Sequence, residues 1–181
     1  MGRLYVVSGS SGVGKGTLLK LFLSKHPDFK LSISCTTRNP RDGEENGKNY
    51  FFITKEEFER KVVHGDFVEY TLYNGNLDGS TKDQIAKNRC VVIDPAGLRA
   101  YIALNDDSIM TFFLDADEET RRERMMARGD DKEKIESRII HDREAFKKEN
   151  IPKVDYHIDS SKLHNVEEVT DEIYRIYTSK K

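Results

Sequence analysis

The segment SGSSGVGKGT, residues 8–17, decides which fold this chain is expected to adopt. It follows the apolar run at residues 4–7, which is typical of a short strand buried on both faces. Apolar side chains then recur at helical spacing, at Leu18, Leu19, Phe22 and Leu23. The sequence therefore predicts a strand, a glycine-rich loop and a helix, in that order.

The loop matches the pattern G-x-x-x-x-G-K and has the composition of a phosphate-binding loop. Its backbone N–H groups can surround phosphate oxygens because few side chains stand in the way. The helix that begins at Lys15 adds unpaired N–H groups and the positive end of its dipole, and the lysine adds a charge for the outer phosphates. The residues predicted to bind ATP are Gly9, Ser10, Ser11, Gly12, Val13, Gly14, Lys15, Gly16 and Thr17.

Gly16 occupies the position at which such loops usually carry a hydroxyl that touches Mg²⁺. The nearest hydroxyl is that of Thr17, one place further on. The ending G-K-G-T resembles that of adenylate kinases, a likeness that implies magnesium held mainly by phosphates and waters. ATP and Mg²⁺ are the expected cofactors, and no direct side-chain ligand to the metal is assigned. Thr17 and Asp94 are candidates for contact through water.

Buried strands alternate with helices along the whole chain. Further strands are predicted at residues 31–35, 50–53, 67–73, 90–93, 109–114 and 156–158. This order implies parallel pairing with right-handed crossovers, and therefore a three-layer α/β fold with a parallel central sheet. The segment from about residue 32 to residue 85 contains closely spaced strands and is expected to form a smaller mixed or antiparallel unit beside the sheet.

Helix starts are marked by capping residues. Thr54 with Glu57 forms a capping-box pattern that predicts a helix to about His64, and Asp94 before Pro95 predicts another helix start. Charged helices are predicted at about residues 118–128 and 132–148, and a closing helix carries an apolar stripe from Val166 to Ile176.

Length and composition limit the classes of function. The 181 residues suit a single domain, and a net charge of −2 argues against general nucleic-acid binding, which needs a basic excess. Cys35 and Cys90 are expected to be free buried thiols, as in a reducing compartment. No apolar run approaches the roughly 20 residues of a membrane span. With no signal-peptide pattern, we expect a cytoplasmic protein that binds no membrane.

A second anion site is predicted around Pro40. Arg38 and Arg41 lie three residues apart in a turn, so their guanidinium groups can converge on one phosphate. The alternative is a pair of solvated loop arginines, and the pattern alone does not decide between the two.

The stretches SISCTTRNPRDGEENGKNYFF (residues 32–52) and FVEYTLYNGNLDGST (residues 67–81) resemble the GMP-binding segments of guanylate kinases. With the glycine loop, the resemblance covers nearly the whole chain. It implies that Ser34, Glu69 and Asp94 face guanine, and that Arg38, Arg41 and Tyr50 hold the GMP phosphate. Ser80 matches a further phosphate or base contact.

The chemistry of Glu69 agrees with this role. Guanine presents two adjacent N–H donors at N1 and N2, and an ionised carboxylate is an acceptor that can take both. Adenine offers an acceptor at N1 and no amine at C2, so it would be rejected. A solvent-facing strand residue is the alternative interpretation of Glu69.

An arginine-rich segment, residues 120–144, also resembles the family. Arg124 and Arg128 lie four apart before Gly129, like the R-x-x-x-R-G start of the guanylate kinase lid, and Arg138 matches the arginine at its end. Phosphoryl transfer needs anions brought together and their charge neutralised, which such arginines can do. The resemblance implies a catalytic role for Lys15, Arg38, Arg124, Arg128 and Arg138. Arg121, Arg122 and Arg143 are instead expected on a solvated helix face.

Three positions depart from the family pattern. Asp78 replaces a tyrosine that holds the GMP phosphate, Val92 replaces the first carboxylate of D-x-D, and D-x-Q-G becomes D-P-A-G with Ala96. A carboxylate beside a phosphate dianion is unfavourable unless it turns away.

These observations predict one guanylate-kinase-like domain over residues 1–181. Its core is expected at about 1–31, 86–124 and 149–181, its monophosphate-binding subdomain at 32–85 and its lid at 125–148. The predicted reaction is transfer of a phosphoryl group from ATP to GMP or dGMP, giving GDP or dGDP and ADP. The alternatives are a kinase for another nucleoside monophosphate and a non-catalytic interaction module. Small nucleotides are the expected partners, for a monomer or a homodimer.

Overall fold

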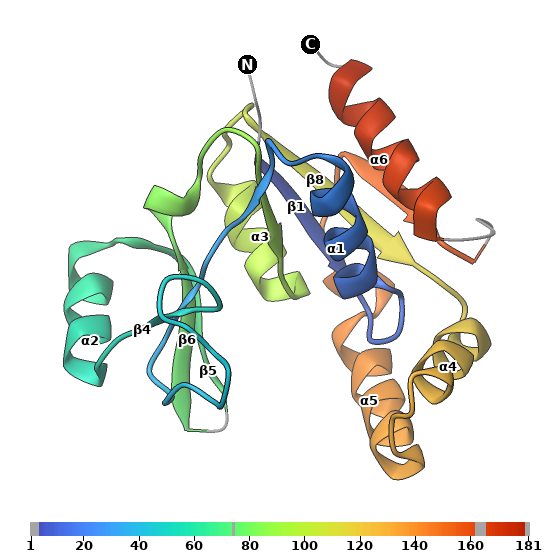
Figure 1. The fold of residues 1–181 in the computed structure, drawn as a ribbon, viewed down its shortest axis with the longest axis horizontal. Coiled ribbons are helices and arrows are strands. Elements are labelled where there is room, and N and C mark those ends of the chain that lie inside the picture. Colours follow the sequence, from blue (N-terminus) through green and yellow to red (C-terminus); the bar gives the residue numbers. More distant parts are fainter. Residues whose placement is uncertain (1–3, 74, 162–165, 180–181) are drawn as a thin grey trace.

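A computed structural model describes residues 4–73, 75–161 and 166–179. Five parallel strands form the central sheet in the order β2-β7-β1-β8-β9 (Figure 1). Their bounds are β1 Leu4–Gly9, β2 Lys30–Leu31, β7 Arg89–Val92, β8 Ile109–Asp115 and β9 Tyr156–Asp159. The predicted parallel sheet is confirmed. Because parallel strands run the same way, the loops after β1, β7 and β8 lie at one edge of the sheet.

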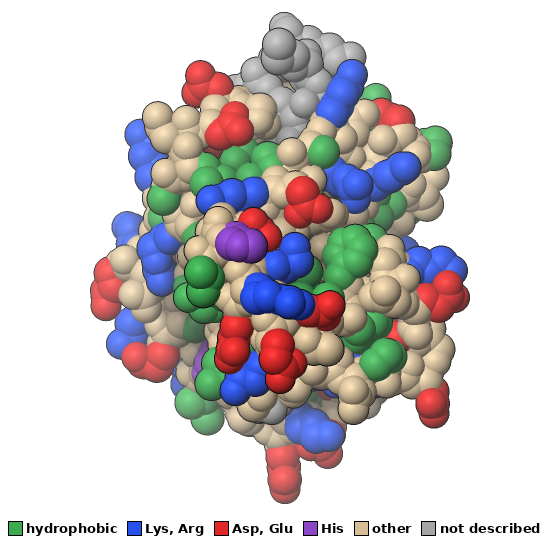
Figure 2. Space-filling model, turned by 90° about the vertical axis from the view of Figure 1, so that its left-hand side faces the viewer, with side chains coloured by type: hydrophobic (Ala, Val, Ile, Leu, Met, Phe, Trp, Pro, Cys, Tyr) green, Lys and Arg blue, Asp and Glu red, His purple; other side chains and the backbone are tan. Residues whose placement is uncertain are grey.

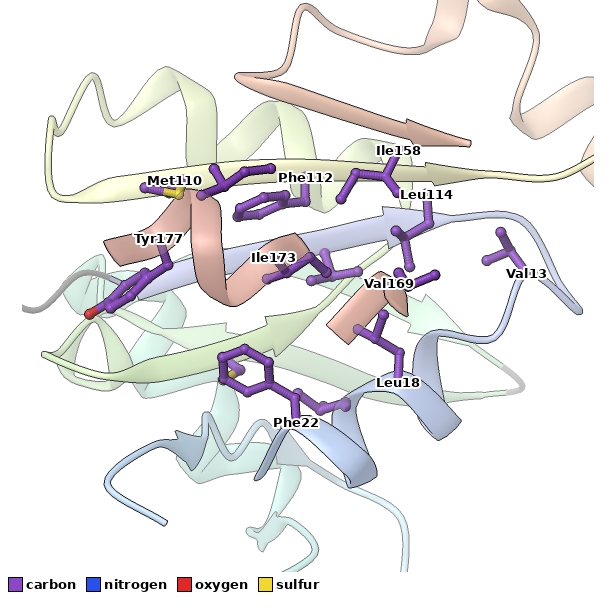
Figure 3. Packing of buried hydrophobic residues seen from close by; sticks show 14 of the residues in the cluster. Val13, Leu18, Phe22, Met110, Phe112, Leu114, Ile158, Val169, Ile173 and Tyr177 are labelled. Atoms are coloured by element: carbon purple, nitrogen blue, oxygen red, sulfur yellow. The ribbon is translucent and has the colours of Figure 1, made fainter. Parts of the chain in front are cut away.

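Helices cover both faces of this sheet. The helices α1 (Lys15–Lys25) and α6 (Val166–Ser179) pack with the central strands in the larger apolar cluster, where Phe22, Phe112 and Ile173 are fully buried (Figure 3). On the other face, α3 (Pro95–Ala103) covers Val6 and Phe113. The three-layer α/β architecture predicted from the alternation of elements is therefore confirmed.

Val13 links the glycine loop to the larger cluster. Its side chain is 3% exposed and lies near Leu114 at the end of the core in Figure 3. The loop is therefore seated on the same apolar layer that joins α1 to the sheet, which limits the positions that its backbone can take.

A second, mixed sheet lies beside the core in the order β4-β3-β6-β5. Its strands are β3 Cys35–Thr36, β4 Phe51–Phe52, β5 Phe67–Tyr73 and β6 Asn76–Thr81. The helix α2 (Lys55–His64) packs on it through Phe58, which stacks on Phe67. The predicted capping box of Thr54 and Glu57 is present at the start of α2. A short 3₁₀ helix, Lys82–Gln84, leads back toward the core.

The structure differs from the predicted strands in two places. The strand expected at residues 31–35 is divided, because Ser32 still bonds Cys90 of the central sheet whereas Cys35 already pairs with Gly79 of the second sheet. The strand β6 was not predicted. Its sequence NLDGST has few β-formers, and pairing with β5 and β3 supplies what its own composition does not.

The helices α4 (Glu118–Ala127) and α5 (Lys132–Ala145) form a hairpin below the core in Figure 1. Gly129 takes a left-handed conformation between them, with φ of 85°. Met125, Ile135 and Ile139 form the apolar contact between the two helices. A 3₁₀ turn at Lys148–Asn150 follows. The predicted core–lid boundary near residue 124 falls within α4, and all the proposed domain boundaries remain predictions.

Both signs of charge are mixed on the side of the molecule that carries the second sheet. Figure 2 shows acidic and basic side chains interspersed there, with smaller apolar groups between them. Val63, Tyr70 and Leu72, from α2 and β5, are among the exposed apolar residues. Among the described residues, no helix combines the length and the apolar character needed to cross a membrane.

Candidate active site

The glycine loop joins β1 to α1, and at two of its positions only glycine fits. A Cβ on Gly9 would collide with the carbonyl oxygen of Leu114. A Cβ on Gly12 would lie 2.6 Å from the carbonyl oxygen of Arg121, and Gly12 also has a left-handed φ of 78°. The loop is therefore packed against β8 and α4 through main-chain atoms alone at these two positions.

Lys15 folds back over the loop. Its ammonium group donates to the carbonyl oxygen of Gly9 and, at 2.9 Å, to that of Ser10. Burial lowers the pKa of Lys15 to about 8, while the Asp142 carboxylate acts in the opposite direction and Arg121 in the same direction. A lysine held in this way places its charge at the centre of the loop, where an anion would enter.

The N–H groups at the start of α1 are free of side-chain caps and can donate to an anion. Gly14 is the N-cap residue and has no side chain, so no side-chain cap bonds the N–H groups of the first turn. These groups and the helix dipole are the features that bind phosphate at helix N-termini. Gly16 and Thr17 lie in this turn, and both are exposed.

A cavity of about 450 Å³ adjoins the loop and has the mixed polar and apolar walls that suit a nucleoside. Its lining includes Gly14, Thr17 and Arg128. Gly12, Val13 and Arg124, which were also predicted as site residues, belong to the lining as well. The other wall residues were not predicted, because they come from four separate segments that only the fold brings together: Leu18, Ala127, Ser160, Val166 and Val169.

Arg124 joins the loop to the end of the last strand of the sheet. Its guanidinium donates to the carbonyl oxygen of Val13 at 3.3 Å and to Ser160 through both the hydroxyl and the carbonyl oxygen. This predicted site residue therefore lies against the loop, on the wall of the adjoining cavity.

The two other predicted lid arginines converge on one carboxylate. Arg128 makes a forked pair with Asp130, with its shorter contact at 2.6 Å, and Arg138 approaches the same oxygen at 2.9 Å. The two guanidinium groups lower the pKa of Asp130, chiefly through Arg128. Both arginines are exposed, so their partner can be exchanged for a more highly charged anion.

The second predicted anion site has the same organisation. Arg38 makes a bidentate pair with Glu44, at 2.6 and 2.7 Å, and the backbone N–H of Arg41 donates to Glu44 at 2.8 Å. These contacts, led by Arg38, lower the pKa of Glu44 to about 2. The Arg38 guanidinium also lies 5.0 Å from the ring centre of Tyr50. Arg38 and Tyr50 are thus brought together, while the Arg41 side chain is exposed.

Glu69 and Ser80 lie side by side on the second sheet, and Ser34 comes immediately before its strand β3. Glu69 pairs with Ser80 across β5 and β6, and the hydroxyl groups of Ser80 and Ser34 are 3.4 Å apart. Burial raises the pKa of Glu69; hydrogen bonds from Ser80 oppose the rise, and the nearby carboxylate of Asp94 adds to it. The interpretation of Glu69 as a solvated strand residue is therefore not supported.

The helix α3 packs close to Glu69. A Cβ on Gly97 would lie 3.4 Å from Cγ of Glu69, so the absence of a side chain there makes room for the carboxylate. Asp94 caps this helix, accepting from the N–H of Gly97 at 2.7 Å. Tyr101, also on α3, is 1% exposed, and its buried hydroxyl lies near Ser80 and Glu69. Burial raises the pKa of Tyr101 to about 12; Ser80 opposes the rise and Glu69 adds to it. The sequence had not indicated this residue.

The arginines assigned to a solvated helix face divide into two groups. Arg122 and Arg143 lie at the surface, where both pair with Glu118. The prediction is wrong for Arg121, which is 7% exposed, because its position on α4 turns inward toward the glycine loop.

The comparisons with known proteins agree with this geometry. A sequence model of the family described as guanylate kinase matches residues 1–176. The guanylate kinase of Clostridium perfringens is 37% identical over 99% of this chain and 84% of its own length. The guanylate kinase of Trichormus variabilis is 38% identical over 77% of this chain and 73% of its own length. The crystal structure of guanylate kinase from Anaplasma phagocytophilum superposes with a TM-score of 0.64 at 26% identity, covering 99% of this chain and 86% of that one.

The chain belongs to the guanylate kinase family. Within this guanylate kinase family member, the departures from the pattern can now be placed. Asp78 lies on β6, two residues from Ser80 and therefore on the same face, and its charge raises the pKa of Arg38 together with the larger effect of Glu44. Its charge therefore acts on the arginine site.

The other departures concern magnesium. Val92 ends β7 without a carboxylate, and Ala96 is exposed in the first turn of α3. The described part of the chain contains no group of three His, Cys, Asp or Glu side chains that could hold a metal ion. One Asp94 oxygen is engaged in capping α3.

Proposed function

We propose that this protein transfers the terminal phosphoryl group of ATP to GMP or dGMP, giving ADP and GDP or dGDP. The observation that carries the proposal is the position of Glu69. Its half-buried carboxylate lies beside Ser80, on the same sheet as the segment that carries Arg38. An acceptor-only group in a polar pocket next to an anion site suits a base with two adjacent N–H donors, as guanine has.

The glycine loop is the proposed donor site. The N–H groups at the start of α1 and the Lys15 ammonium would hold the ATP phosphates, as in other loops of this pattern. The cavity beside the loop, with Leu18, Val166 and Val169 in its wall, would receive the nucleoside end. Ser10, Gly12 and Val13 would shape this site through their backbone.

The arginine site is the proposed acceptor site. Arg38, Arg41 and Tyr50 would hold the GMP phosphate, with Glu44 giving up Arg38 to the more highly charged ligand. Ser34, Glu69 and Asp94 would read the base, and Ser80 would support Glu69. No general base is required, because the acceptor phosphate is already an anion near neutral pH.

Arg124, Arg128 and Arg138 would act on the group in transfer. Charge spreads over the equatorial oxygens in the transition state, and preplaced guanidinium groups neutralise it. Arg124 already contacts the loop, whereas Arg128 and Arg138 would have to exchange Asp130 for the phosphoryl oxygens. Movement of the part of the helical hairpin that carries Arg128 and Arg138 toward the loop would bring them there and would exclude water.

The cofactor, location and partners follow from the same proposal. Mg²⁺ would bind as the complex with ATP and supply charge neutralisation at the phosphates. Cys35 and Cys90 are buried, and neither is in a disulfide among the described residues; this suits a cytoplasmic location, since reducing compartments disfavour disulfides. The small nucleotides are the proposed partners, with no nucleic acid or membrane.

A coupled assay over all common nucleoside monophosphates, with Mg·ATP as donor, tests the proposal. GMP and dGMP should be the preferred acceptors, and AMP and the pyrimidine nucleotides should react far more slowly. Faster turnover of any other monophosphate would move the function to a different kinase of this fold. Absence of ATP binding in calorimetry, with and without Mg²⁺, would instead indicate a non-catalytic interaction module.

A further inference from the structure

A buried ion pair joins the two lid helices directly beside the glycine loop. Arg121 of α4 contacts Asp142 of α5 at 3.1 Å, and their side chains are only 8% and 6% exposed. The other contacts between charged groups of these helices, such as Arg122 with Glu136, lie at the surface. The buried pair is therefore distinct in position from the ordinary ion pairs of the hairpin.

Both members of the pair bind the same loop residue. The backbone N–H of Ser11 donates to Oδ2 of Asp142 at 2.7 Å, and the carbonyl oxygen of Ser11 accepts from Arg121 at 3.2 Å. The next residue, Gly12, packs on the main chain of Arg121. The two main-chain polar groups of Ser11 are thus held by side chains that come from 110 and 131 residues away in the chain.

The contact with Ser11 is stronger than a neutral hydrogen bond. A carboxylate that accepts from a backbone N–H makes a charge-assisted bond, and its partner guanidinium cancels the negative charge that would otherwise face the nucleotide phosphates. The pair is not arranged for maximum stability, because Nε of Arg121 is buried without a partner among the described residues. Buried ion pairs contribute little net stability as a rule, so a role in placing the loop is the better account.

We infer that Arg121 and Asp142 are positioning residues that clamp Ser11 and thereby set the shape of the phosphate-binding loop for the nucleotide. The inference deepens the proposed function and depends on it, since the loop must bind ATP for its shape to matter. This role requires no contact of either residue with the substrate. The pair acts through the loop backbone, and it does not engage the N–H groups at the start of α1, which stay available to bind phosphate.

Two consequences follow for the molecule. The Ser11 N–H is engaged before any nucleotide binds, so it contributes to ATP binding by holding the loop rather than by donating to a phosphate. Asp142 also anchors the end of α5 to the loop. The moving part of the lid then ends before residue 142, several residues earlier than the boundary near 148 predicted from the sequence.

The test replaces the pair by apolar side chains of similar size, in the variant R121M/D142L. Such a replacement removes both charges together, which typically preserves or improves stability, but it leaves Ser11 without its partners. The matched control is R122M/E136L, which removes a surface pair between the same two helices that does not contact the loop. Thermal melting, calorimetric binding of ADP, and KM for ATP and for GMP are measured for both variants.

The pair variant should melt at or above the wild-type temperature yet bind ADP about 10-fold more weakly, the cost of one charge-assisted hydrogen bond. Its KM for ATP should rise by a similar factor while its KM for GMP stays unchanged. The control should match the wild type in all of these. Wild-type affinity for ADP in the folded pair variant overturns the inference. A wild-type protein that does not bind ADP refutes the proposed function instead.

A second measurement needs no variant. Hydrogen exchange of backbone amides in the wild-type protein, resolved by NMR, reports whether Ser11 is already bonded. We expect the Ser11 amide to be protected equally with and without ADP, and the amides of Gly14 and Lys15 to gain protection only with ADP. Protection of Ser11 that appears only with ADP would contradict the clamp, even if the pair variant failed to fold.

Discussion

The two anion sites of this protein are built in opposite ways. The loop that contains Lys15 offers mainly backbone N–H groups, held in place by close packing at Gly9 and Gly12. The site around Arg38 offers side chains, and the Arg38 guanidinium is already paired with the carboxylate of Glu44. The first site is preformed, whereas the second has to exchange an internal partner for its ligand.

The two sites therefore differ in which anions they can bind. A main-chain site binds any phosphate of the right shape, and its specificity rests on geometry. A site of paired charges binds only an anion that competes with a carboxylate, which a phosphate dianion does through its higher charge. The internal pair also keeps the Arg38 guanidinium from lying unpaired when the substrate is absent.

The largest effect is expected where the preformed site loses its lysine charge. Lys15→Ala should reduce turnover by about 10³-fold or more. The loop would retain its backbone groups, but it would lose the ammonium that neutralises charge on the phosphoryl group during transfer. A coupled assay with saturating GMP measures the loss. The melting temperature should stay close to that of the wild type, and substantial residual turnover would mean that the backbone alone suffices.

The selectivity of the acceptor site should depend on Glu69. Glu69→Gln presents an amide donor beside one of the guanine donors, so the preference for GMP over AMP should fall by about 10²-fold. Competition between the two monophosphates measures this ratio directly. An unchanged ratio would remove Glu69 from the base pocket.

The same residue predicts opposite effects of pH on activity and on stability. Burial raises the pKa of Glu69 above its usual 4.5, so the fold favours the neutral acid. This contribution to stability is present at low pH and is lost as the pH rises through the folded pKa. Binding of GMP needs the ionised form and therefore improves over that interval. Glu69→Gln should melt at a higher temperature than the wild type at neutral pH, and it should lack the acid limb in kcat/KM for GMP.

Two glycine substitutions test whether close packing sets the shape of the loop. Gly12→Ala forces a left-handed alanine against the carbonyl oxygen of Arg121, whereas Gly16 has an ordinary φ and a Cβ added there would meet no atom within 4 Å. The first variant should weaken ADP binding by about 10-fold through strain and displacement, and Gly16→Ala should have little effect. Calorimetry on both proteins decides the point, and equal losses would show that packing does not shape the loop.

The sequence was sufficient for features that neighbouring residues determine. The loop, the capping box at Thr54, the cap at Asp94 and the strand at residues 67–73 all depend on residues close together in the chain, and all were predicted. The identities of the candidate site residues could also be predicted, because they lie in short sequence motifs.

Features that depend on distant contacts could not be read in this way. The strand β6 exists because two other strands pair with it, and the wall of the loop cavity combines residues from both ends of the chain. Arg121 looks like any other arginine of a charged helix until Asp142 and Ser11 are placed beside it. Its burial follows from the packing of α4, which the pattern of charges did not reveal.

The smallest effect concerns the departure at Asp78, which lies near the arginine site rather than away from it. Its carboxylate opposes a phosphate dianion at Arg38, and the site carries that cost in the wild-type protein. Asp78→Asn removes the charge at nearly constant size, so KM for GMP should fall about 3-fold with little change in kcat or in KM for ATP, as a screened charge pair would give. The effect should shrink as salt is added. A rise in KM instead would mean that Asp78 holds Arg38 in place, and the second site would then depend on two internal carboxylates rather than one.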